Sequence, residues 1–173
     1  MRKIIILLLL ASQSVLAQEN QQMAFLQLEA DGMSKEIRQR GPFHAITRDK
    51  KGKVIAALDR PYIVGDQVFL RIRVSNHSAI SYDVDLIKFF IRDRKTARRT
   101  ITQELEVHPV ERLFVSRVPG RQKRTFVFTL DKFTLADNKV FCSELFEKGG
   151  GRHLQLRLKG NHLNRALPLP SSE

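Results

Sequence analysis

The chain has 173 residues, of which 42% are hydrophobic and 28% are charged, and this composition is typical of one globular domain rather than a disordered chain. The length and the pattern exclude a solenoid, a large α/β enzyme and a multi-span transporter. Thirty Lys and Arg residues against eighteen Asp and Glu residues give a formal charge of +12. This excess favours acidic partners, such as nucleic acid, an anionic membrane surface or an acidic patch on another protein.

The first 17 residues have the pattern of a Sec signal peptide. Arg2 and Lys3 provide a positive start, Ile4–Leu10 is an unbroken aliphatic run, and Val15–Ala17 suits a signal peptidase. The apolar run is shorter than the roughly 20 residues that a transmembrane helix needs. We therefore expect export and cleavage after Ala17, which removes two positive charges and leaves a mature chain of charge +10.

Cys142 is the only cysteine. An exported protein with one cysteine has no internal disulfide, so its hydrophobic core must stabilise it. Because Cys142 lies in an apolar stretch, we expect it to be a buried, small hydrophobic side chain rather than half of an intermolecular disulfide.

Residues 18–42 form a polar segment with a short helix. Leu26, Met33 and Ile37 recur near helical spacing, and the charged residues between them suit an exposed helix face. Asp31-Gly32 interrupts this pattern, so the segment contains one short helix or two, ending before Gly41-Pro42. We expect this helix to pack on the domain or on a partner.

From about residue 43 the hydrophobic period becomes two, which predicts β-strands. In residues 68–75 an apolar inner face alternates with a basic outer face, which we expect to be wet because it contains Arg71 and Arg73. Further strands are predicted near 53–58, 83–92, 100–108, 126–130, 139–147 and 154–158. Within 83–92 the apolar phase slips, which indicates a bulge near Ile87-Lys88 or burial on both faces.

Turn signals separate these strands, at Asp49–Gly52, Gly65-Asp66, Asn76–Ser78, Pro119-Gly120 and Gly149–Gly151. Short strands with hairpin-like turns favour an all-β fold, an antiparallel β-sandwich that is immunoglobulin-like or related. A small barrel is the alternative, and a parallel βαβ fold does not fit because no crossover helix lies between the strands. The sandwich should span residues 43–167, followed by a flexible tail at 168–173.

No catalytic, cofactor or metal motif stands out. The turn Glu147–Arg152 is rich in glycine but lacks the Gly-Lys-Ser/Thr ending of a phosphate loop, so it is a hairpin turn. Asp83 and Asp85 could share a cation, although ion pairs with nearby arginines fit better. Glu104 and Glu106 share a strand face, as charged residues on a solvent face often do. We therefore expect no enzymatic activity, no cofactor and no metal.

The densest charge lies between two predicted strands, at residues 92–99. It can be a solvated turn with local ion pairs or a rim that binds an anion or a protein partner. No aromatic residue interrupts the run, so a base-stacking platform is not indicated. We define the candidate rim by five basic residues: Arg92, Arg94, Lys95, Arg98 and Arg99.

The segment Tyr82–Lys95 resembles the "YDID…R-F-x-IRDKK" stretch of TraN proteins from conjugative transposons of the Bacteroides type. Similar segments continue in the same order and spacing over residues 58–167, at Ala97–Thr100, Gln103–Glu106, Pro109, Leu130–Leu135, Glu144–Lys148 and Gly150–Leu154. Members of this family are usually longer, with an extra N-terminal domain after the signal peptide, so the chain resembles a short form.

This resemblance implies a periplasmic protein, associated with the cell envelope or the outer-membrane complex, in a conjugative type IV secretion apparatus. It implies a structural role through contacts with other conjugation proteins, and the assembly would be a homo-oligomeric or hetero-oligomeric ring. It implies no enzymatic activity and no cofactor. The alternative is a free periplasmic module that binds a polyanion or single-stranded DNA, and nucleic acid is the less favoured partner.

Overall fold

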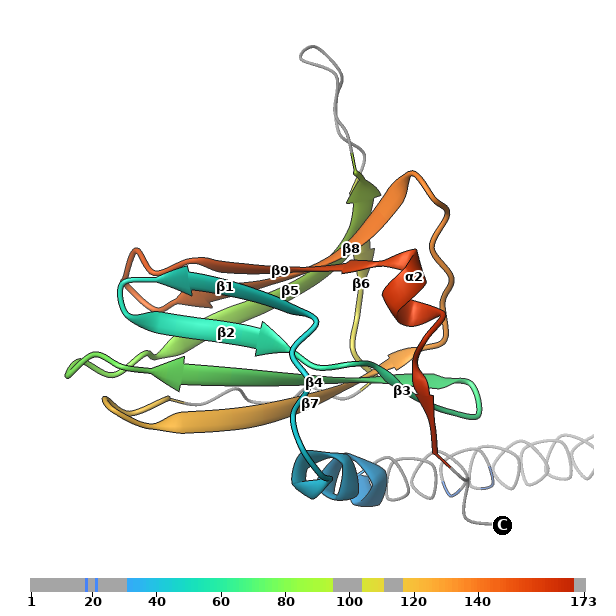
Figure 1. Ribbon diagram of the computed structural model, residues 1–173, viewed down its shortest axis with the longest axis horizontal. Coiled ribbons are helices and arrows are strands. Elements are labelled where there is room, and N and C mark those ends of the chain that lie inside the picture. Colours follow the sequence, from blue (N-terminus) through green and yellow to red (C-terminus); the bar gives the residue numbers. More distant parts are fainter. Residues whose placement is uncertain (1–17, 19–20, 22–30, 95–103, 111–116, 170–173) are drawn as a thin grey trace, which may run out of the picture.

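The computed structural model describes residues 18, 21, 31–94, 104–110 and 117–169, in which two β-sheets pack face to face (Figure 1). The expected all-β class is confirmed. The first sheet contains β1 (Thr47–Lys51), β2 (Val54–Leu58), β3 (Tyr62–Val64), β4 (Gln67–Asn76), β7 (Lys123–Asp131) and β10 (Leu167–Pro168). The second sheet contains β5 (Val84–Asp93), β6 (Leu105–Val107), β8 (Lys139–Glu147) and β9 (Leu154–Lys159), and a short helix, α2 (Gly160–Leu163), follows β9.

Strand β4 is the centre of the first sheet. Strand β7 pairs along one whole edge of β4, while β2 and β3 share the other edge, each over one half of its length. Strand β1 continues the sheet beyond β2. All of these pairs are antiparallel, and the two-residue strand β10 adds a short parallel pair with β3. In the second sheet the strand order is β6-β5-β8-β9, again antiparallel.

The main core lies between the two sheets, and the period-two alternation of the sequence correctly identifies it. The inward-facing residues of β4 and β9 are fully buried, and Phe128 of β7 meets Phe89 of β5 edge to face, with ring centroids 5.1 Å apart. Phe89 also stacks on Phe141 of β8. Burial of these rings and aliphatic side chains is the main force that holds the sandwich together, since no disulfide is present and Cys142 is buried as expected.

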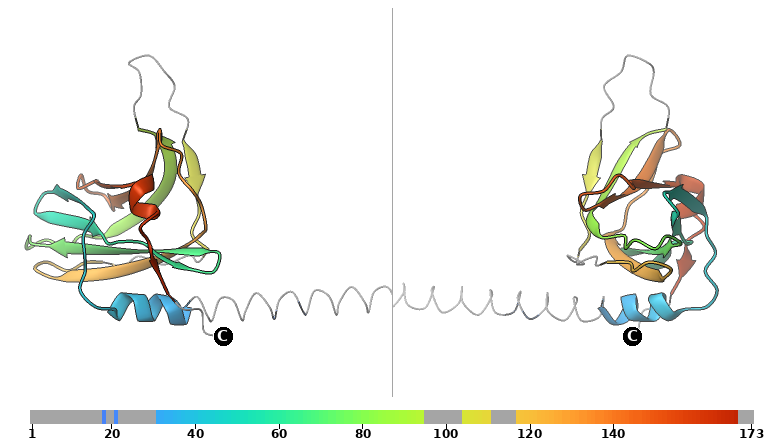
Figure 2. Two further views of the ribbon diagram at one scale, coloured as in Figure 1. Left: turned by 45° about the vertical axis from the view of Figure 1, so that its right-hand side comes forward. Right: turned by 90° about the vertical axis from the view of Figure 1, so that its left-hand side faces the viewer.

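A helix at residues 31–39 lies across the outer face of the first sheet (Figure 2). Its Ile37 is buried with Phe69 of β4, Tyr62 of β3 and Leu169 near the end of the chain, in a second hydrophobic cluster. The helix therefore packs on the domain. The prediction of a wet outer face on β4 is wrong for its first half, because this helix covers Phe69 and Arg71.

Several local predictions also need correction. Residues Asp49–Lys51 belong to strand β1 rather than to a turn, and the chain reverses at Gly52 and Lys53, both with positive φ. The register shift in β5 lies between Val84 and Leu86 rather than at Ile87-Lys88. The sequence places a tail from residue 168 onward, whereas Pro168 still pairs in β10 and Leu169 is buried.

The predicted positions of strands β2, β8 and β9 are confirmed to within one residue at each end. The proposed signal peptide, residues 1–17, lies outside the described residues. Within the part of the chain that the structure describes, no helix has the length and apolarity to cross a membrane.

Candidate functional site

The candidate rim begins at the end of β5, where the structure places two of its five residues. The guanidinium carbon of Arg92 lies 5.6 Å from the centroid of the Phe90 ring. Nη1 of Arg92 also lies 3.8 Å from Oε1 of Glu104. Arg94 donates to the backbone oxygen of Asp137, 2.9 Å away. Both side chains therefore contact groups of the domain itself, as expected for a turn with local pairs. Lys95, Arg98 and Arg99 lie outside the described residues.

On the outer face of the second sheet, which begins next to this rim, the cations of β5 lie close to an acidic residue. Lys88 and Arg92 flank Phe90 on β5 and cover its ring, and both approach Glu104 at 3.9 and 3.8 Å. Because their long aliphatic stems cover apolar surface, Phe90 and Cys142 are buried although they point away from the main core. Burial raises the pKa of the Cys142 thiol, so this cysteine is a packed side chain rather than a reactive thiolate.

Two of the carboxylates that suggested chemistry, Asp83 and Glu104, form ion pairs. Asp83 accepts from Nε of Arg117 at 2.7 Å, and this hydrogen bond lowers the pKa of Asp83. Asp85 is exposed next to the bulge in β5. Glu104 pairs with the two cations of β5 described above. The described residues contain no group of three His, Cys, Asp or Glu side chains placed to hold a metal ion.

The glycine-rich turn between β8 and β9 is the hairpin turn that the sequence predicts, and Gly149 has the positive φ that such a reversal needs. Arg152 at its end forms an ion pair with Glu147, and donates to the backbone oxygen of Ser81 at 2.6 Å and to Oγ of Ser78 at 3.2 Å. The guanidinium of Arg152 lowers the pKa of Glu147. This arginine joins the hairpin to the connection between β4 and β5, a structural role.

Arg71 is the most deeply buried charge, with 1% of its side chain exposed, and it pairs with Asp59, which is 2% exposed. Its Nε donates to Oδ2 of Asp59 at 2.7 Å, and its Nη1 donates to the backbone oxygens of Ile37, at 3.0 Å, and Arg40. These oxygens lie at the end of the N-terminal helix, where carbonyl groups lack partners within the helix. Arg71 is therefore bound on all sides and cannot reach an external partner.

The open half of the outer face of the first sheet carries a second group of basic residues. Strand register sets two rows across the sheet, because directly paired residues share a face. The first row is Arg48, Ala57, Arg73 and Thr125, and the second row is Lys50, Ile55, Ser75 and Lys123. We call the four cations of these rows, Arg48, Lys50, Arg73 and Lys123, the basic face.

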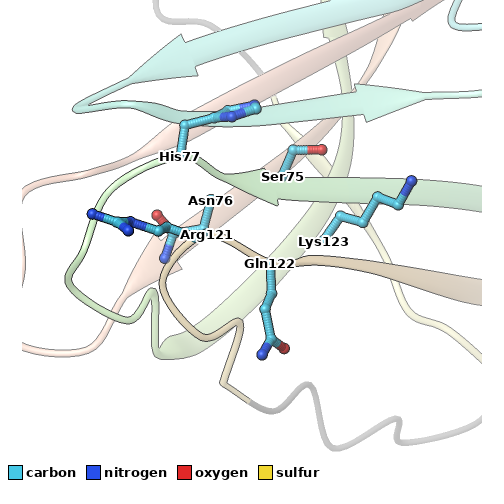
Figure 3. A pocket seen from close by; sticks show the side chains of 6 residues that line it. All are labelled: Ser75, Asn76, His77, Arg121, Gln122 and Lys123. Carbon is cyan, nitrogen blue, oxygen red and sulfur yellow. The ribbon is translucent and has the colours of Figure 1, made fainter.

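A hollow of about 340 Å³ adjoins the basic face, where β4 ends and β7 begins. Figure 3 shows Ser75 and Lys123 next to each other on the two strands, with His77 and Arg121 in the loops beyond them. Arg121 has a positive φ of 59° and donates its backbone N–H to Ser78. The hollow thus extends a surface of cationic donors beyond the end of the sheet.

Sequence reasoning did not find the basic face, although it identified the alternating arginines of β4. The contributing positions lie in three strands that are up to 75 residues apart, between Arg48 and Lys123. The signal that could have found them is the repeated i, i+2 spacing of cations in 48–50, 71–73 and 121–123. That spacing becomes informative only once the strand register is known.

Comparison with known families places the chain. A family model described as "Domain of unknown function (DUF4138)" matches residues 30–168. The chain belongs to this family. The match includes the N-terminal helix as well as the whole sandwich, and a search of curated proteins finds no match.

Proposed function

We propose that the protein is a periplasmic structural component of a conjugative type IV secretion apparatus and acts through protein–protein contacts. Two arguments support this function: the signal-like residues 1–17, and the resemblance of residues 58–167 to TraN proteins. The two-sheet sandwich is compatible with the same role. In such an apparatus the domain would add rigid surfaces to an assembly rather than carry out chemistry.

The observation that carries the proposal is the edge of the second sheet at β6. This strand is only three residues long, and among the described residues it pairs with β5 on one side alone. Its Leu105 side chain is 67% exposed, and Val110 shortly after it is 46% exposed. An open strand edge next to exposed apolar side chains can pair with a strand of another protein, with backbone hydrogen bonds for affinity and side chains for specificity.

The test is a Leu105→Lys variant, which places a charge on this edge. We expect the variant to fold normally and to lose both co-purification with conjugation proteins from detergent-extracted envelopes and DNA transfer in a mating assay. A matched control is Leu86→Lys, since Leu86 is 54% exposed on β5, away from the β6 edge. The Arg98→Glu, Arg99→Glu double variant tests the candidate rim in the same assays.

Two results would contradict the proposal. Full transfer and full co-purification of a folded Leu105→Lys protein would show that the β6 edge is not a docking surface. A protein recovered from the cytoplasm with residue Met1 retained would remove the periplasmic role itself.

A further inference from the structure

The basic face gathers four cations on neighbouring strands of one sheet. On the second sheet, Lys88 and Arg92 approach Glu104. None of the four cations of the basic face forms an ion pair with a carboxylate of the described residues, and the register places no acidic side chain in either of its rows. Arg73 donates to Oγ1 of Thr125 within the face, 3.5 Å away. Like charges held together without counter-charges repel one another, so this arrangement favours an external anion.

Most of the side chains between the cations are small, with Ile55 as the one larger apolar side chain in the two rows. Ala57, Ser75 and Thr125 occupy the centre, while Arg48 and Lys50 lie on β1 and Lys123 lies on β7. Strands β1 and β7 are three strand spacings apart, about 14 Å. Successive rows are two residues apart along each strand, about 7 Å. This repeat is suited to a linear polymer that carries charge at regular intervals.

The composition of the face favours nucleic acid over an acidic protein. Protein interfaces have an apolar centre and are depleted of lysine, whereas interfaces with nucleic acid are polar and strongly positive. The basic face has Arg73 near its centre and lysines at two margins, and the strongly exposed large hydrophobic residues of the described chain lie elsewhere: Ile80, Leu86, Leu105 and Val110. The aromatic ring of Phe43 is covered by Arg73, whose guanidinium carbon lies 4.0 Å from the ring centroid.

From these observations we infer that the basic face binds the phosphate backbone of a single-stranded nucleic acid without reading its bases. The guanidinium and ammonium groups of the basic face only donate hydrogen bonds, and phosphate oxygens only accept them. The basic face and a phosphate backbone are therefore complementary in charge and in hydrogen bonding. Phosphates are part of the polymer backbone, whereas the carboxylates of an acidic peptide must give up side-chain rotamer freedom to pair. The inference rests on the charges alone and does not depend on the β6 edge.

The test measures binding of a fluorescent dT20 oligonucleotide to the mature chain, by anisotropy, over a range of salt concentrations. Each neutralised phosphate on a single strand contributes about −0.7 to the slope of log K against log salt. Four cations therefore predict a slope of about −3. The Lys50→Ala, Lys123→Ala double variant should reduce the slope to about −1.4, because two contacts remain.

The matched control removes the same charge from the other sheet. Arg157 and Lys159 are exposed residues of β9, outside the basic face, so Arg157→Ala, Lys159→Ala should leave the slope near −3. Unlabelled poly-L-glutamate of equal charge should compete at least tenfold more weakly than unlabelled dT20. Equal competition would assign the face to an acidic protein and overturn the inference. Absence of dT20 binding at low salt, or equal slopes for the two double variants, would overturn it as well.

Discussion

Replacing Arg71 by methionine tests the buried ion pair that joins the helix to the sandwich. Methionine fills much of the same volume but carries no charge and no donor. The change leaves the carboxylate of Asp59 buried without its cationic partner, and it removes the donor to the backbone oxygens of Ile37 and Arg40. Breaking a fully buried pair on one side costs about 3 to 5 kcal/mol.

For a protein of this size, a loss of about 4 kcal/mol lowers the melting temperature by roughly 8 to 16 °C. Thermal melts and urea titrations of Arg71→Met measure this loss. The matched control is Arg73→Met, two residues along the same face, where the side chain is partly exposed and pairs with no carboxylate of the described residues. We expect this control to cost less than about 1 kcal/mol.

A second substitution separates loss of the pair from loss of packing. Adding Asp59→Asn to Arg71→Met removes the unpaired buried charge, so the double variant should be more stable than the sum of the two single losses allows. Equal, small losses for Arg71→Met and Arg73→Met would refute the reasoning, since they would mean that Arg71 is solvated as the alternation alone suggested.

Two further predictions concern the core and the hairpin turn. Phe128→Ala should cost about 3 to 5 kcal/mol in urea titrations, because it opens a cavity against Phe89, and a loss no larger than that of Arg73→Ala would contradict the face assignment. Because Arg152 lowers the pKa of Glu147, their pair stabilises the fold above the ordinary glutamate value of 4.5, and this contribution disappears as pH falls through the lowered pKa. The difference in melting temperature between the natural protein and Glu147→Gln should therefore shrink as the pH falls below 4.5, and a constant difference would contradict the pairing.

The sequence predicts β4, β7 and β9 well because every second residue of these strands is apolar and faces the main core, which gives a period of two. Strands β3 and β10 have only three and two residues, too few for any period to appear. The burial of Arg71 could not be predicted either. It depends on the helix that crosses β4, and alternation within a strand carries no information about what covers its outer face.

The candidate sites divide in the same way. The rim was found because its residues are consecutive, and the structure shows that Arg92 and Arg94 interact within the domain. The basic face was missed because only the register of β1, β2, β4 and β7 brings its cations together. Composition indicated an excess of positive charge, but not where that charge lacks acidic neighbours.

Because one guanidinium group joins Asp59 to the last carbonyls of the N-terminal helix, the helix and the sandwich should open as one cooperative unit. The amide protons of residues 31–39 would then exchange with solvent as slowly as those of the central strands, rather than at the fast rate of a fraying end. A fragment that begins at residue 43 would expose Phe69 and leave Arg71 without its helix carbonyls. The smallest autonomous folding unit therefore starts before the first strand, at or upstream of residue 31.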